Sequence, residues 1–431
     1  MPFAPTRSGD LLRFAPMNVG RWFIWGTTAL VMLALPLVFR QGFALTLMSS
    51  MGTMIIFALS YNMLLGQSGM LSFGHAVYSG LGAYVAVHTL NLIGKGQIPL
   101  PVPLLPLVGG LAGAFFGVLF GYVTTKKSGT TFAMITLGIG EMVFASALMF
   151  PAFFGGEGGV STNRVVPKPF LGITLGPSIQ VYYLIALWCF LSMVLMYAWT
   201  ATPLGRIANA VRDNPERVAF IGYDTQRVRY LTLILSAFFA GIAGALQCIN
   251  FEIVTAENVS AARSGGPLIA AFVGGVGFFF GPIIGAVIFI FFVVALSDFT
   301  KAWQLYLGLF FVLMVMFAPG GIASLIALNL RVLEHGMLAR LRWHYLWVLL
   351  AGAVTFAGFI AVVEMTYQLN DIAADGKGRV FGIAFDAQTF TPWLVAGTLL
   401  VAGGLALRSA WRGFRREWGE IEQTILDRGS A

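Results

Sequence analysis

Charged residues are scarce in this chain of 431 residues. Asp, Glu, Lys and Arg make up only 10% of it, compared with about 25% in an average soluble domain. Cysteine is scarcer still, and Cys189 and Cys248 both fall in apolar stretches without the spacing of metal ligands. We interpret them as buried free thiols, with a structural pair as the alternative. The composition therefore argues against an ordinary soluble protein.

Sequence motifs for catalysis and nucleotide binding are also missing. The Gly-Lys pairs at 94–95 and 376–377 lack the other residues of a phosphate-binding loop. No dinucleotide fingerprint, nucleophile elbow or zinc-type His-Glu spacing is present, and the 4 histidines are scattered. The sequence therefore predicts no enzyme, and no cofactor or metal bound by this chain.

Apolar residues are abundant instead, at 58% of the chain, and the mean hydropathy is +0.83. Stretches long enough to cross a hydrocarbon core of about 30 Å recur along the sequence. They lie near residues 22–39, 43–65, 70–93, 100–123, 131–153, 179–199, 230–252, 303–318, 344–364 and 391–407. We predict an all-α helical bundle that crosses the lipid bilayer many times, with the first span retained as an anchor.

The net charge of +8 comes from Lys and Arg residues dispersed at the ends of these stretches. A nucleic-acid-binding protein would gather them on one basic face, so we expect no nucleic acid partner. Basic residues accumulate on the cytoplasmic side of membrane proteins, so the arginines before the first span place the N-terminus there. Alternating crossings then put Lys126, Lys127 and the segment 202–229 inside, and the loops 154–178 and 253–264 outside.

One region breaks this alternation unless it crosses the membrane twice. Residues 266–297 would form a single helix of about 48 Å, yet four glycines and Pro282 interrupt its centre. We predict two short crossings hinged near 278–281, with a re-entrant loop as the alternative. The total is then about 10–12 crossings, with both termini cytoplasmic.

A polar segment, residues 202–229, separates two of the predicted spans. Thr202 is a suitable N-cap for a helix with Pro203 at its first position, and apolar residues recur at helical spacing after it. Asn214 and Pro215 repeat the arrangement for a second helix of about two turns, which ends before Gly222. A helix this short is not stable alone, so we expect it to dock on something outside the bilayer.

Glycines interrupt two of the predicted spans. One interruption runs from Gly66 to Gly82, and the other lies within 266–297. Discontinuous helices in corresponding halves of a transporter line its path near the middle of the membrane. The alternative is that these glycines only let helices pack closely.

Ionisable residues inside the spans are further candidates for a transport path. Glu141 lies well inside an apolar stretch, where a charge is unfavourable by about 3 kcal/mol. Either it has a functional role, or it is protonated and bonded to a neighbouring helix; His75 is either a substrate contact or a packed histidine. The candidate path residues are Gly69, Ser72, His75, Thr136, Glu141, Gly274, Gly275 and Gly277.

Five segments, in this order, resemble the branched-chain amino acid ABC transporter permease family of the LivM type. They are MLSFGHA at 70–76, FAMITL at 132–137, GGEGGVSTN at 155–163, the polar segment 202–229, and GGVG at 274–277 followed by GPIIGA at 281–286. Each motif is weak alone, but together they cover about residues 43–325. The glycine-rich third segment is either a flexible linker or a surface that receives a partner.

The resemblance implies a type II-like ABC importer permease in the bacterial inner membrane. Such a permease works with a second permease subunit of the LivH type, two cytoplasmic ATP-binding subunits and a periplasmic solute-binding protein. ATP is then used by the partner ATPase and not by this chain. The implied solutes are branched-chain amino acids, while related systems import urea, amides or aromatic acids.

By the same resemblance, residues 202–229 are the loop that couples the permease to its ATPase, with the 214–222 helix in a groove of that partner. Thr202 and Leu204 stand where Ser and Phe are more usual, which does not disturb capping. The expected coupling residues are Arg206, Asn209, Arg212, Asn214, Pro215, Glu216, Ala219, Gly222 and Tyr223.

We expect three parts in the chain. Residues 1–42 hold the N-terminal tail and first transmembrane helix, 43–325 the permease core, and 326–431 a C-terminal extension with two further transmembrane helices. The extension departs from the family pattern, and it contains an acidic outer loop at 371–386. Its tail has aromatic residues at helical spacing among arginines, which predicts an amphipathic helix at the membrane surface.

An ion-coupled secondary transporter is the alternative function. It would need an ion site inside the membrane, for which Glu141 and His75 are the available residues. A structural or signalling membrane protein would leave the paired interruptions without a purpose. The sequence favours a permease that is moved by a separate ATPase.

Overall fold

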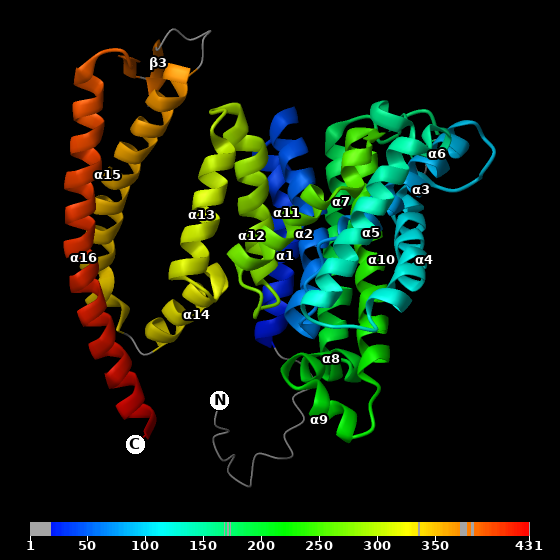
Figure 1. Ribbon diagram of the computed structural model, residues 1–431, viewed down its shortest axis with the longest axis horizontal. Helices are drawn as coiled ribbons and strands as arrows, with labels where there is room; N and C mark the ends of the chain where they lie inside the picture. Colours follow the sequence, from blue (N-terminus) through cyan, green and yellow to red (C-terminus); the bar gives the residue numbers. More distant parts are fainter. Residues whose placement is uncertain are drawn as a thin grey trace. The chain divides into compact units, whose positions relative to one another are not determined.

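The computed structural model describes residues 19–430 except 168, 170, 171, 173, 335, 336, 371–376, 381 and 382. The chain forms two compact units, unit 1 up to Ala271 and unit 2 from Phe272 onward, both built largely from helices (Figure 1). In the described part, nine helices are long and apolar enough to cross a membrane, or ten if the bent pair of α13 and α14 is one span. The predicted all-α, polytopic fold class is confirmed.

Unit 1 contains most of the long helices. Its elements are α1 (Val19–Val38), α2 (Gly42–Ser68), α3 (Ala76–Gly94), η1 (Val102–Leu104), α4 (Leu105–Thr124), α5 (Thr130–Met149), α6 (Pro151–Phe154), η2 (Gly156–Gly158), β1 (Val160–Ser161), α7 (Ser178–Ala201), α8 (Pro203–Asp213), α9 (Pro215–Phe220), α10 (Thr225–Phe251), β2 (Ile253–Val254), η3 (Ala256–Val259) and the start of α11 (Ala261–Gly274). Every apolar stretch predicted up to residue 252 corresponds to a helix.

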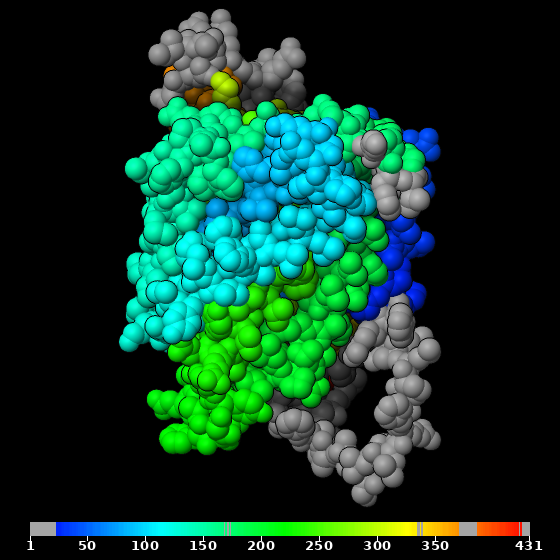
Figure 2. Space-filling model, turned by 90° about the vertical axis from the view of Figure 1, so that its right-hand side faces the viewer, coloured from blue at the N-terminus to red at the C-terminus, as the bar shows by residue number. Residues whose placement is uncertain are grey.

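Helix α10 is central to unit 1, because it packs against α2, α3 and α4. Figure 2 shows α4 in cyan beside α10 in green on one face of this unit. The contact is made by glycines four residues apart on α4: a Cβ at Gly117 would lie 2.8 Å from the Cβ of Ala237, and one at Gly113 would clash with the Ala237 carbonyl. Backbones approach this closely only where side chains are small. The centre of unit 1 is therefore closely packed.

The glycine-rich loop after α6 is held by hydrogen bonds. Strand β1 pairs with β2 in antiparallel register, and the Arg164 guanidinium donates to the carbonyls of Leu175, Ile249 and Asn250 at 2.8–3.0 Å. Arg164 also forms a salt bridge with Glu252 at 3.8 Å. These contacts argue against the flexible-linker interpretation of this loop.

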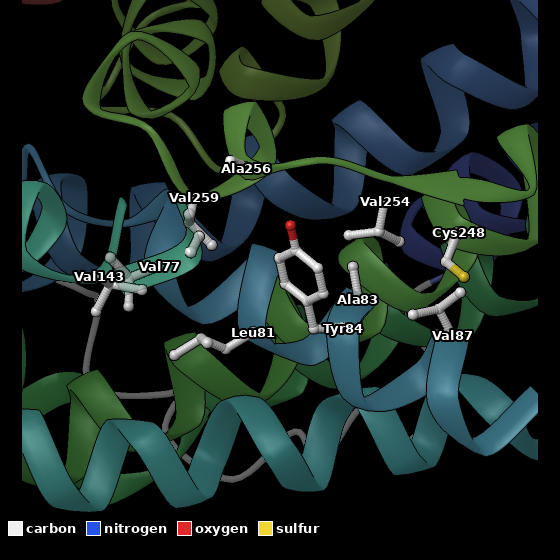
Figure 3. Packing of buried hydrophobic residues seen from close by; sticks show 11 residues of the cluster. Val77, Leu81, Ala83, Tyr84, Val87, Val143, Cys248, Val254, Ala256 and Val259 are labelled. Atoms are coloured by element: carbon white, nitrogen blue, oxygen red, sulfur yellow. The ribbon is translucent and has the colours of Figure 1, made fainter. Parts of the chain in front are cut away.

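The segment that follows β2 enters the helical bundle. Figure 3 shows Ala256 and Val259 of this segment beside α3, with the Tyr84 hydroxyl pointing toward Ala256. Val259 is buried and occupies the space over Gly80, where any Cβ would clash with it. The 253–264 region, predicted as an outer loop, therefore lies partly inside unit 1 because its apolar side chains pack on α3.

Unit 2 continues from α11. Its elements are α12 (Gly281–Ile290), extended by a π-helical turn (Phe291–Ala295) and a 3-10 turn (Leu296–Asp298), then α13 (Trp303–Phe317), α14 (Gly321–Glu334), α15 (Leu338–Asn370), β3 (Lys377–Val380), β4 (Ile383–Asp386) and α16 (Phe390–Ser430). The break between α11 and α12 lies at 275–280, so two helical segments occupy the predicted region 266–297. Strands β3 and β4 occupy part of the predicted acidic loop, and the rest of that loop lies outside the described residues.

The C-terminal extension is a hairpin of two long helices. Helix α15 packs along α16, and Gly358 lies so close to α16 that a Cβ there would be 2.5 Å from the Leu400 nitrogen. The predicted amphipathic tail forms the end of α16, a single helix of 41 residues. Its Phe414 and Trp418 pack on Leu341 and Tyr345 of α15, whereas Trp411 is 43% exposed, so the aromatic face is covered in part within the extension.

Candidate coupling loop and transport path

Residues 202–229 form the two short helices that the capping residues predict. Thr202 Oγ1 accepts a hydrogen bond from the Gly205 amide at 3.2 Å at the start of α8, and Asn214 Oδ1 accepts one from the Arg217 amide at 2.9 Å at the start of α9. Gly222 ends the second helix at φ 93°, a left-handed value that suits glycine. Both predicted caps and the glycine stop are confirmed.

Helix α8 is fixed to the helical bundle. It packs against α2, α7 and α10 through its buried residues Ala208 and Val211. Asn209 Nδ2 donates to Gln67 Oε1 at 2.8 Å, and the Arg212 guanidinium donates to the Gly66 carbonyl. Both bonds reach the last turn of α2, so α8 and the end of α2 are expected to move together.

Helix α9 is exposed. Val218 is its one buried residue, whereas Phe220 is 89%, Ile221 67% and Tyr223 47% exposed. Glu216, Arg217 and Ala219 are exposed beside them. The green atoms at the lower end of unit 1 in Figure 2 belong to this region, at the end opposite α6 in Figure 1. Contiguous apolar side chains on an exposed, charged segment are typical of a contact surface.

The other predicted coupling residues lie on the same two helices. Arg206 is exposed on α8, and Asn214 and Pro215 are exposed at the start of α9. Gly69, a predicted path residue, also belongs here: it ends α2 at φ 69°, and a Cβ on it would lie 2.9 Å from Arg212 Cγ. It is therefore a direct neighbour of the 202–229 loop.

The first glycine interruption, between α2 and α3, contacts two further helices, α5 and α11. Between α2 and α3, the Phe73 amide donates to Thr136 Oγ1 of α5 at 3.2 Å. A Cβ at Gly74 would clash with the Thr136 carbonyl, so the two backbones touch. The Ala76 amide, at the start of α3, donates to Ser264 Oγ of α11 at 2.9 Å. The free backbone donors of this interruption thus find side-chain acceptors on α5 and α11.

His75 is a packed histidine. It is fully buried, its Nε2 lies 3.0 Å from Ser60 Oγ, and its ring stacks on Phe57 with centroids 5.5 Å apart. Among the described residues, His75 Nδ1 and Ser72 Oγ have no hydrogen-bond partner. The geometry favours the packing interpretation of His75 over direct contact with a solute.

Glu141 lies on the exposed side of α5, with Met134, Gly138 and Met142. The described part of the chain provides it with no salt bridge or hydrogen bond. The structure therefore does not show the alternative, in which Glu141 is bonded to a neighbouring helix of this chain.

The second interruption is a steric junction within unit 2. A Cβ at Gly274 would clash with the Gly281 carbonyl, and one at Gly275, which has φ 114°, would clash with the Gly320 carbonyl. Gly277 has open space around its Cα. Here glycine is required for close packing, as the alternative interpretation proposed. Within unit 1, the structure thus brings Ser72, His75, Thr136 and Glu141 into one region.

The sequence analysis did not identify Arg263 and Ser264 as residues of this region. Arg263 and Ser264 were assigned to an outer loop, because nothing in the pattern shows that residues 255–260 enter the bundle. The run Ser260–Pro267, with two serines and an arginine next to glycines, was the available signal.

Cys189 and Cys248 are buried free thiols, as predicted.

Comparison with known proteins agrees with this architecture. Residues 43–319 match the family model of the branched-chain amino acid transport system / permease component. The chain is 30% identical over 292 residues to the high-affinity branched-chain amino acid transport system permease protein LivM of Salmonella typhimurium and of Escherichia coli, covering 62% of this chain and 67% of each relative. It is 22% identical over 247 residues to the permease protein BraD of Pseudomonas aeruginosa, covering 55% and 79%.

No solved structure matches the chain significantly. The matched range ends at residue 319, so the hairpin of α15 and α16 lies outside it. The match spans more than half of the chain and includes both helices of the 202–229 loop. The chain belongs to the branched-chain amino acid transport permease family, and it is a permease component of an ABC import system, not an enzyme.

Proposed function

We propose that this chain forms half of the translocation path of an ATP-driven importer in the bacterial inner membrane, and that α9 receives the movement of a separate ATPase. The exposure of Phe220, Ile221 and Tyr223 carries this proposal. Three large apolar side chains are unfavourable in water and would be buried in a groove of a partner. Both termini and the 202–229 loop are then cytoplasmic, where the ATP-binding subunits are.

The contacts of α8 provide a route for that movement. When ATP draws the two ATP-binding subunits together, α9 moves with them as a rigid body. Helix α8 follows, and its bonds to Gly66 and Gln67 pull on the end of α2. The interruption that begins at Gly69 lies directly after this end, so the displacement reaches the contacts with α5.

The exposed face of α5 is the proposed wall of the path. A carboxylate at Glu141 is unfavourable in lipid, so this face fits a water-filled path shared with a second permease subunit of the LivH type. His75 and Thr136 hold the interruption in place through their hydrogen bonds, and Ser72 is buried beside them. In this proposal they shape the path without contacting the solute.

The complete importer has two cytoplasmic ATP-binding subunits and a periplasmic solute-binding protein. Relatives named for branched-chain amino acid transport support L-leucine, L-isoleucine and L-valine as solutes, and aromatic acids, urea or amides are the alternatives. Residues 43–325 form the permease core, between residues 1–42 and the extension at 326–431.

Solute uptake tests this function. The chain is purified with its associated subunits and placed in membrane vesicles with the solute-binding protein, with or without internal ATP. We expect uptake only with internal ATP and with the ATP-binding subunits present. Uptake that follows an ion gradient without those subunits would mean a secondary transporter.

A bulky substitution tests the coupling helix. Ala219→Trp places an indole on the exposed face of α9 and should prevent association with the ATP-binding subunits while membrane insertion continues. Ala406→Trp, an exposed position of α16, is the matched control. If the Ala219→Trp complex assembles and transports normally, α9 is not the coupling element.

A further inference from the structure

Two helices begin next to each other inside unit 1. Helix α3 starts at Ala76 after the first interruption, and α11 starts at Ala261 after the segment that enters the bundle. The Ala76 amide donates to Ser264 Oγ in the first turn of α11, and Val259 fills the space over Gly80 of α3. The partial positive charges of two helix N-termini are therefore close together.

Arg263 adds a full positive charge at the same place. It lies in the first turn of α11, which contains no acidic residue, and its side chain is partly buried. A cation near a helix N-terminus is unfavourable, and so is a charge removed from water. The fold must therefore compensate the charge of Arg263, or leave it for something else to neutralise.

The described residues compensate this charge only in part. The guanidinium donates one hydrogen bond, from Arg263 Nη2 to Gln247 Oε1 of α10 at 2.6 Å. Gln247 is neutral, and no described Asp or Glu forms a salt bridge with this guanidinium. By contrast, Arg164 has both three carbonyl acceptors and Glu252. The Gln247 side chain thus orients the Arg263 guanidinium, but no described carboxylate neutralises its charge.

We propose that Arg263 binds the carboxylate of the solute as the solute passes through this permease. The proposal rests on the proposed function, because it requires that this chain has a translocation path and that Arg263 faces it. A guanidinium presents five donors in a planar fork that fits the two oxygens of a carboxylate. The bond to Gln247 uses one of these donors and holds the fork in position.

Uptake by the whole complex provides the first test. Vesicles with internal ATP and the solute-binding protein are offered L-leucine, benzoate, urea and acetamide in turn. Arg263→Gln should lower the uptake of L-leucine or benzoate about ten- to a hundredfold, the usual effect of losing a charged hydrogen-bond partner. Arg263→Lys keeps the positive charge but lacks the planar fork of donors. Its uptake of L-leucine should lie between that of the wild type and that of Arg263→Gln. Arg412→Gln, the same change at an exposed position of α16, should leave uptake unchanged.

Restoring the charge by chemistry provides the second test, and it does not depend on how well Arg263→Gln folds. Arg263→Cys introduces a thiol, while the native Cys189 and Cys248 are buried. An aminoethyl methanethiosulfonate should recover part of the uptake and a sulfonatoethyl reagent should not. L-leucine should slow both labelling reactions if it occupies the site, and leucinamide should not.

The outcomes separate this proposal from the proposed function. If the wild type takes up only urea or acetamide with ATP, the carboxylate site is wrong while the importer stands. Unchanged uptake by Arg263→Gln also overturns it. If Arg263→Gln and Arg263→Cys both insert in the membrane but lose the second permease subunit, the missing anion is a carboxylate of that subunit and not the solute. Uptake without ATP would overturn the importer itself.

Discussion

Helices α8 and α9 are adjacent in the sequence and are built alike, yet their surroundings differ. Both have a polar N-cap followed by proline, and both carry arginines. Ala208 of α8 is buried against the bundle, whereas Phe220 at the end of α9 is 89% exposed. The difference shows that one helix is packed into the permease fold, and it supports our proposal that the other binds a partner. Substitutions in α8 should therefore lower the stability of the chain, and substitutions in α9 should lower its affinity for a partner.

The largest effect is expected from a charge on the buried side of α8. Ala208→Asp would place an unpaired carboxylate where the Ala208 side chain is fully buried, and it should destabilise the protein by about 3–5 kcal/mol. Thermal unfolding of the detergent-solubilised chain measures this. Ala210→Asp, on the exposed side of the same helix, should change stability by at most about 0.5 kcal/mol. Equal melting temperatures for both variants would contradict the packing described for α8.

A smaller and more selective effect is expected at the end of α9. Phe220→Ser should leave the melting temperature of the chain unchanged, because the ring is exposed. It should weaken binding of the ATP-binding subunits by about 2 kcal/mol, or roughly thirtyfold, if the ring is a buried anchor in the complex. Titration of the labelled chain with those subunits gives the affinity. The control is Phe299→Ser, because Phe299 of unit 2 is 85% exposed. If both variants bind the ATP-binding subunits with the same affinity, Phe220 is not an anchor in the complex.

The smallest effect is expected from the cap between the two helices. Asn214→Ala removes the acceptor of the Arg217 amide, which should destabilise α9 by about 1 kcal/mol. Because α9 is not part of the packed bundle, the affinity for the ATP-binding subunits should drop by about fivefold while the global melting temperature stays constant. Asn214→Asp retains the acceptor and should bind like the wild type. A lowered melting temperature would show that α9 supports the permease fold.

Much of the loop was predictable from its sequence, because caps and short-range spacing act within a few residues. Thr202, Asn214 and Gly222 have the expected roles. The apolar spacing on α8 also indicated which side packs on the bundle. Neither pattern could identify the contacts of Asn209 and Arg212 with the end of α2, since those partners are more than 140 positions away.

The path region was predicted less well. Sequence analysis assigned the same possible role to the glycines at both interruptions. The first interruption has hydrogen bonds to side chains of α5 and α11, whereas Gly274 and Gly275 are constrained by the carbonyl groups of Gly281 and Gly320. His75 was a candidate for contact with the solute and is instead packed between aromatic rings. Side-chain type does not reveal which of two faces of a helix is covered.

The sequence by itself determined that this protein is a membrane-spanning permease whose polar loop has two capped helices, because composition, caps and motifs depend on local chemistry. Tertiary structure alone decided that α8 is fixed to α2, that Glu141 is exposed, and that Arg263 lies beside the start of α3 without a described carboxylate. Those properties depend on which distant residues meet, and side-chain packing sets them after the helices have formed.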